Sequence, residues 1–191
     1  SRRWHRGSLG PQVFRRQMGF DALLQRKIMG RFATGVALVT SVEEDVPCGM
    51  TANSLTSLSL NPPLILLAVN RENQMYKALS LSQQFSISLL SVGQEHVARR
   101  FASNGPKDFY DLSVNVGITG CPVLQDSLGY IHCSVVETFP GGDHGIFVGE
   151  CVAGEVFEGE PLVYYSGGFT RLRPSVAAGG VDENQFFLSQ S

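Results

Sequence analysis

Residues 49–70 of this 191-residue chain read GMTANSLTSLSLNPPLILLAVN, and this stretch decides the class of fold. Its last part, Leu64–Val69, is an almost wholly apolar run, which predicts a strand that is covered on both faces. The triplet Asn61-Pro62-Pro63 breaks the chain just before that run. Another strand is expected from Pro47 to Leu55. The stretch therefore predicts two strands on either side of a break.

Small hydrogen-bonding side chains are dense around that break, namely Thr51, Asn53, Ser54, Thr56, Ser57 and Ser59. Such a density is unusual in a core strand. It would suit the polar edge of an isoalloxazine ring, which presents N–H and C=O groups in one plane. A solvent-facing strand or a turn rich in serine and threonine explains the same residues equally well.

The regions on either side predict further strands at 36–42, 85–90, 130–139, 146–157 and 162–165. Helices are expected at about 17–30, 74–79 and 96–101, and residues 103–126 are expected to be mainly loop. The alternation of Phe, Ser, Ile, Ser and Leu from Phe85 predicts a half-buried strand. Strict β-α alternation is missing, and neither G-x-G-x-x-G after a strand nor a P-loop is present. The chain is therefore expected to be mainly β with flanking helices, as a barrel or sandwich.

Two further segments are candidates for chemistry. In Arg31–Val36, the small residues Thr34 and Gly35 allow backbone N–H groups to approach a ligand closely. In Gly141–Glu150, the glycines predict a tight hairpin that holds His144 at the mouth of a strand. Taken alone, each segment is more often an ordinary helix-to-strand junction or an ordinary hairpin.

Taken together, the motifs resemble the flavin reductase family with the FMN-binding split β-barrel, a Greek-key fold. The matching segments are GRFATGVALVTS, GMTANSLTSLSLNPPLILLAVN, QFSISLLS, GDHGIFVGE and PLVYYSGGF. Their order and spacing agree with the family over about residues 20–170. Members of this family are the small reductase components of two-component flavin-dependent monooxygenases.

The resemblance implies a set of site residues. By it, the flavin contacts are Thr34, Gly35, Val36, Thr51, Ala52, Asn53 and Ser54, with Ser57 and Leu58 nearer the ribityl phosphate and Arg71 near the phosphate. The segment of His144, Ile146 and Phe147 is implied to contact the nicotinamide, with His144 as its orienter. No metal ligand is expected, because the histidines and cysteines lack metal-ligand spacing.

The implied activity is hydride transfer from NADH or NADPH to FMN or FAD, which supplies reduced flavin to a partner monooxygenase. The resemblance also implies a homodimer, and a charged fraction of only 17% agrees with extra apolar surface between subunits. An FMN-binding electron carrier or flavin-storage protein without NAD(P)H turnover would use the same fold. A pyridoxamine-phosphate-oxidase-like or haem-binding barrel would need a basic cluster or a spare axial histidine, and a regulatory module would bind no flavin.

Charge is unevenly distributed along the chain. Residues 1–31 hold eight basic residues and one acid, Asp21, although the whole chain has a net charge of −2. We expect residues 1–16 to be a flexible basic arm, residues 17–173 the flavin reductase-like domain and residues 174–191 a tail. No run approaches the length of a membrane span, and neither nucleic acid nor membrane is expected as a partner. Four cysteines without a C-x-x-C pair or a signal peptide indicate free thiols in the cytoplasm.

Overall fold

The computed structural model describes residues 20–104 and 107–173. The helices are α1 (Ala22–Met29), α2 (Gln74–Ser82) and α3 (Glu95–Ala102), with a 3-10 turn at Val92–Gln94. The strands are β1 (Thr34–Gly35), β2 (Ala37–Glu43), β3 (Val46–Ala52), β4 (Leu55–Leu60), β5 (Pro63–Asn70), β6 (Gln84–Leu89), β7 (Val114–Val116), β8 (Pro122–Leu124), β9 (Gly129–Gly141), β10 (His144–Val156), β11 (Val163–Tyr165) and β12 (Gly168–Thr170). The expected N-terminal arm and C-terminal tail lie outside the described residues.

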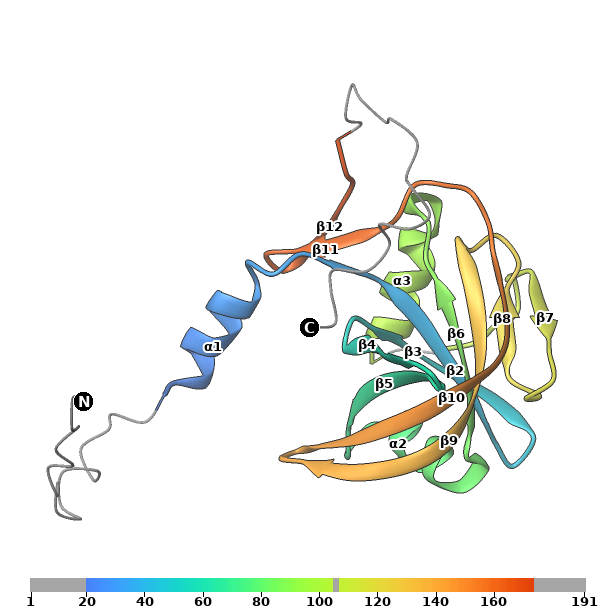
Figure 1. Cartoon of the computed structure of the whole chain (residues 1–191). Coiled ribbons are helices and arrows are strands. Elements are labelled where there is room, and N and C mark those ends of the chain that lie inside the picture. The colour runs from blue at the N-terminus through green and yellow to red at the C-terminus, as the bar shows by residue number, and fades with distance from the viewer. Residues whose placement is uncertain (1–19, 105–106, 174–191) are drawn as a thin grey trace, which may run out of the picture.

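The main element is a seven-stranded antiparallel sheet in the order β3-β2-β6-β9-β10-β5-β4. Figure 1 shows this sheet curling on itself, with its two edge strands β3 and β4 consecutive in the chain. A second sheet has the order β1-β11-β12, with β11 paired to both of the others. The expected fold class, mainly β with flanking helices, is confirmed.

The inside of the curled sheet is filled by alternate residues of its strands. In β5, Ile65, Leu67 and Val69 are buried, and Met75 and Leu79 of α2 close the same core. The intervening residues of β5 are only half-buried. The expectation that this strand is covered on both faces is therefore wrong for the single chain, because nothing in the described structure fully covers its outer face.

A second core lies on the other face of β2. Leu38 is fully buried there against α3, which contributes Val97, Ala98 and Phe101. The helix packs this way because its apolar residues recur at helical spacing, while Arg99 is exposed and the half-buried Arg100 pairs with Asp111. α3 and the strands that follow it thus form a second layer beside the curled sheet.

The described part of residues 103–126 is mainly loop, as expected, but it also contains the short paired strands β7 and β8. This segment covers β6 and buries both of its serines. Ser88 Oγ accepts a hydrogen bond from the Leu124 N–H at 3.0 Å, and Ser86 Oγ lies 3.1 Å from Thr119 Oγ1. The expectation of a half-buried β6 is wrong for this reason: its serines bind protein groups and not water.

His132 of β9 completes this buried polar cluster. Its Nδ1 lies 2.6 Å from Ser86 Oγ and 3.0 Å from Thr119 Oγ1, and the residue is 3% exposed. Burial lowers the pKa of His132 below its ordinary value of 6.5, since the charged ring would lose its hydration.

We expect acid to destabilise the fold through His132. The unfolded chain takes up this proton at a higher pH than the folded chain does, so this contribution is present above pH 6.5 and is lost as the pH falls through the folded pKa. Urea unfolding across that range should show a smaller loss for His132→Gln than for the wild type. His96→Gln, on the exposed side of α3, is the control for removing a histidine that is not buried, and its profile is compared with that of His132→Gln. An unchanged profile in His132→Gln would contradict the assignment.

Candidate functional site

A cleft of about 590 Å³ opens where β1, β4 and β5 meet. Its lining combines an apolar wall with a few hydroxyl and amide groups. The lining residues are Phe32, Ala33, Thr34, Gly35, Val36, Ala37, Asn53, Ser54, Leu55, Thr56, Leu66, Ala68, Leu89, Leu90, Leu128, Pro161 and Leu162. None of these described residues carries an ionisable side chain, so the cleft can hold and orient a largely apolar ring, but it offers no general acid or base.

The cleft brings together two segments that are distant in sequence. Thr34 and Gly35 form β1, and Asn53 and Ser54 connect β3 to β4. The Asn53 Nδ2 donates a hydrogen bond to Thr34 Oγ1 at 3.1 Å, which joins the two segments directly. Apart from Gly35 itself and its two chain neighbours, no atom lies within 4 Å of the position that a Cβ on Gly35 would take, so its backbone faces open space. Of the predicted contacts, Thr34, Gly35, Val36, Asn53 and Ser54 line this one cleft.

The Ser54 hydroxyl already donates its proton in a hydrogen bond within the protein. Ser54 Oγ donates to the Ala68 carbonyl at 2.7 Å, and the Ala68 N–H donates to the Ser54 carbonyl at 3.0 Å. These two bonds fix Ser54 against β5 at the entrance of the cleft. The Ser54 hydroxyl oxygen is therefore available to a ligand as an acceptor, which suits a ligand N–H group.

Thr51 and Ala52 line a separate hollow of about 200 Å³, which shares Val36 and Asn53 with the cleft. The Thr51 hydroxyl donates to the Ala98 carbonyl at 2.7 Å and so ties β3 to α3. The structure thus places these two predicted contacts beside the cleft and not inside it.

Ser57, Leu58 and Arg71 do not line the cleft. Ser57 and Leu58 are exposed on β4, at a register shift against β5. The Arg71 Nε donates to the His144 carbonyl at 3.2 Å, and the Arg71 backbone N–H donates to the Asp143 carbonyl at 3.1 Å. Arg71 therefore holds the tip of the β9–β10 hairpin against the end of β5.

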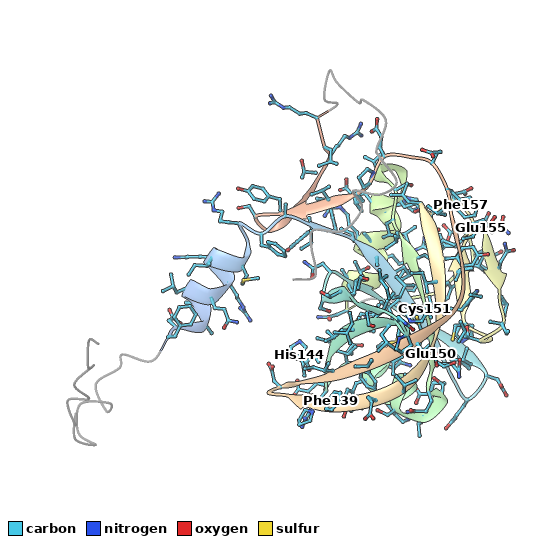
Figure 2. The ribbon with its side chains drawn as sticks, in the orientation of Figure 1. Phe139, His144, Glu150, Cys151, Glu155 and Phe157 are labelled. Atoms are coloured by element: carbon cyan, nitrogen blue, oxygen red, sulfur yellow. The ribbon has the colours of Figure 1, made fainter. Side chains whose placement is uncertain are left out.

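His144 stands at that tip, as Figure 2 shows, opposite Gly141 of β9. Its side chain is 39% exposed, and its Nδ1 lies 2.7 Å from Asp143 Oδ1. The contact with His144 lowers the pKa of the Asp143 carboxyl below its ordinary value. The Asp143 carboxylate holds the ring through Nδ1, and Nε2 forms no hydrogen bond with the described residues.

The register of β10 decides which residues share the face of the cleft. Ile146 lies opposite Ala68, which lines the cleft, and His144 lies opposite Asn70. Because side chains alternate along a strand, Ile146 and His144 share the face of Ala68. Phe147 points the other way. It is fully buried and packs edge-on against Tyr76 at 5.4 Å, so its ring belongs to the core and not to the cleft.

Sequence reasoning missed part of the lining. Leu66 and Ala68 could have been found from alternation along β5, because the buried residues of this strand occupy the other face. Leu89, Leu128 and Pro161 come from three separate segments that meet only in the folded chain. No local signal in the sequence indicates such a meeting.

Within residues 20–104 and 107–173, no cluster of histidine, cysteine, aspartate or glutamate could hold a metal ion. None of the helices described in that part of the chain is long and apolar enough to cross a membrane.

Comparison with known proteins places the chain among relatives of similar length. Residues 29–173 match the family model described as flavin reductase like domain. An NADH-dependent flavin reductase from Rhodococcus sp is 38% identical over 169 residues, which cover 87% of this chain and 91% of the relative. The reductase component of 4-nitrophenol 4-monooxygenase/4-nitrocatechol 2-monooxygenase from Rhodococcus opacus is 37% identical over 149 residues, covering 78% and 80%.

Among solved structures, one similar chain is the NADH:FAD oxidoreductase of Streptomyces globisporus C-1027 in complex with NAD and FAD fragments. It superposes with a TM-score of 0.78 at 34% identity, covering 82% of this chain and 96% of that one. The matched region of the family model, residues 29–173, contains both the cleft and the β9–β10 hairpin.

Proposed function

The chain belongs to the family of flavin reductase like domains, and from this premise we propose that it uses NADH or NADPH to reduce FMN or FAD. The observation that carries the proposal is the cleft in which Thr34 and Gly35 meet Asn53 and Ser54. Bound flavin supplies the redox chemistry, because it accepts a hydride from the reduced nicotinamide. The protein is left with binding and orientation, for which a cleft without ionisable groups is suited.

The lining of the cleft fits a flavin ring. Leu66 and the leucines at its far side offer an apolar wall for the ring faces. Asn53, held by Thr34, and Ser54, held by Ala68, offer amide and hydroxyl groups at fixed positions for the polar edge. Groups held by the protein in this way need no reordering when the ligand binds, which favours tight and oriented binding.

The predicted contacts that do not line the cleft are assigned to parts of the ligands by their positions in the fold. Ser57 and Leu58 on β4 are proposed to lie toward the ribityl phosphate. Ser57 pairs with Ile65, whereas Arg71 follows the other end of β5, so the positive charge proposed for Arg71 would reach the phosphate from the opposite side of the cleft. Thr51 and Ala52 border the second hollow. His144 and Ile146 are proposed to contact the nicotinamide, because they share the sheet face of the cleft.

The test of this function is an absorbance assay of NADH and NADPH oxidation, with FMN, FAD and riboflavin added in turn. We expect steady oxidation that depends on the added flavin. Tight flavin binding with no oxidation of either nicotinamide would instead identify an electron carrier or a flavin-storage protein.

We also propose that the reduced flavin serves a monooxygenase, as the name of the Rhodococcus opacus relative indicates for that protein. The four free cysteines fit a reducing compartment, and we propose a cytoplasmic location. Addition of a flavin-dependent monooxygenase should couple NADH oxidation to oxygenated product, and a dependence of product on this protein would support the pairing.

A homodimer is proposed from surfaces that the single chain leaves uncovered. In Figure 1, α1 extends away from the main sheet, and no residue of this helix is buried. Leu23, Leu24 and Ile28 recur at helical spacing and are 61%, 46% and 52% exposed. A second copy of the chain would cover this helix together with the outer face of β5. We expect an interface of more than roughly 2,000 Å².

Replacing Leu24 by glutamate should weaken the dimer. Loss of a buried leucine at an interface is expected to raise the dissociation constant on the order of 10- to 100-fold. Light scattering over a micromolar dilution series measures this constant. Gln25→Glu on the same helix is the matched control and should leave it unchanged. A monomeric wild type at micromolar concentration would contradict the proposed dimer.

A further inference from the structure

The hollow beside the cleft is lined by Val36, Thr51, Ala52, Asn53, Ala102, Tyr164 and Phe169, and has a volume of about 200 Å³. Val36 and Asn53 line both spaces, so the hollow is an annex of the cleft. The proposed binding of flavin in the cleft leaves this annex without a role.

Two aromatic rings form one wall of the annex. Tyr164 and Phe169 lie opposite each other on β11 and β12, with ring centroids 5.6 Å apart at an interplanar angle of 64°. The guanidinium carbon of Arg99 lies 5.1 Å from the centroid of the Phe169 ring. Arg99 is itself held by Glu95 at 2.6 Å. The two rings thus pack edge to face, and both are partly buried against the second core.

The other wall carries hydrogen-bonding groups at the side toward the cleft. Asn53 donates through Nδ2 to Thr34, and its Oδ1 forms no hydrogen bond with the described residues, so it can accept from a ligand. No acidic or basic residue belongs to the described lining. Aromatic rings combined with an amide acceptor are suited to a flat heterocycle that carries an amino group.

We propose that this annex binds the adenine ring of a dinucleotide whose flavin or nicotinamide end occupies the cleft. The inference rests on the proposed function and goes beyond it, because it assigns a site that distinguishes dinucleotides from mononucleotides. The adenine belongs either to FAD or to NADH, and both present the same ring with the same amino group. A volume about a third that of the cleft gives room for one such ring and not for a whole nucleotide.

The test compares dinucleotides with mononucleotides in the Phe169→Leu variant. FMN and FAD affinities are measured by equilibrium fluorescence titration, and kcat/KM is measured for NADH and for reduced nicotinamide mononucleotide. Loss of one stacking ring should weaken one dinucleotide by about tenfold and leave its mononucleotide counterpart unchanged. A loss of affinity confined to FAD assigns the annex to the adenine of FAD. A loss of kcat/KM confined to NADH assigns it to the adenine of NADH.

Two further variants make the result decisive. Ala102→Leu fills the annex from the exposed end of α3, without touching the core, and should produce the same selective loss. Phe157→Leu is the matched control, because this partly exposed ring also has an aromatic neighbour, Tyr130 at 6.2 Å, and lies at the far end of β10 from His144 in Figure 2. It should change neither the two flavin affinities nor the two kcat/KM values.

The inference is overturned if Phe169→Leu and Ala102→Leu leave all four values unchanged, or lower those of dinucleotides and mononucleotides equally. If either result is found while the wild type turns over normally, only the adenine site is disproved and the proposed function stands. A wild type that binds neither FMN nor FAD and oxidises no NADH removes the proposed function, and the annex with it.

Discussion

Replacing Ser54 by tyrosine is expected to weaken flavin binding at least about 100-fold, which corresponds to roughly 2.7 kcal/mol. Ser54 is exposed at the entrance of the cleft, so the phenol ring would occupy the space proposed for the flavin. The fold should lose only about 1 kcal/mol, the value of one hydrogen bond, because the Ser54 hydroxyl donates to the Ala68 carbonyl. Fluorescence titration with FMN and FAD measures the first quantity, and urea unfolding measures the second.

The chain offers a matched control for this variant. Ser80 of α2 is also exposed, and its hydroxyl donates to a backbone carbonyl, that of Tyr76, at the same distance of 2.7 Å. Ser80→Tyr makes the same change outside the cleft and should leave flavin affinity at the wild-type value. Unchanged affinity in Ser54→Tyr would show that the flavin does not lie in this cleft.

Replacing His144 by alanine is expected to lower kcat/KM for NADH by about 10- to 100-fold, equivalent to one orienting contact of about 1–3 kcal/mol. The hairpin tip is held by Arg71, and the Asp143 carboxylate holds the His144 ring through Nδ1. The imidazole is therefore held at the tip with Nε2 available for a contact to the nicotinamide. Flavin affinity should be unchanged, because His144 does not line the cleft.

Steady-state kinetics with NADH varied at saturating flavin provides the measurement. Thr138→Ala is the control, because Thr138 lies opposite Phe147 and so on the other face of the hairpin. If His144→Ala has the wild-type kcat/KM, the residue is an exposed turn residue with no part in nicotinamide binding.

The parts of the site that could be predicted are those encoded locally. Thr34 and Gly35 follow a helix and precede a strand, and Asn53 and Ser54 lie between two strands, so short motifs reveal them. The alternation along β10 also separates two residues that the sequence analysis assigned to one contact. Consecutive residues of a strand face opposite sides, so Ile146 and Phe147 could not both face the cleft.

The parts that could not be predicted depend on which segments meet. β6 has the pattern of a half-buried strand, yet Ser86 and Ser88 are buried because residues 103–126 fold over them. The annex likewise depends on the pairing of β11 with β1, which brings Tyr164 beside Val36. Hydrophobic periodicity describes one segment at a time and does not specify these long-range partners.

The edges of the main sheet have a consequence for behaviour at high concentration. β4 carries a register shift between Ser57 and Ser59, and β3 carries Pro47, which has no backbone N–H to donate. Neither edge therefore presents a long regular row of free donors and acceptors on which another chain could add a strand. We expect concentrated solutions to resist fibrillar, amyloid-like growth, so that copies of this chain associate through side chains and not through a continuous backbone ladder.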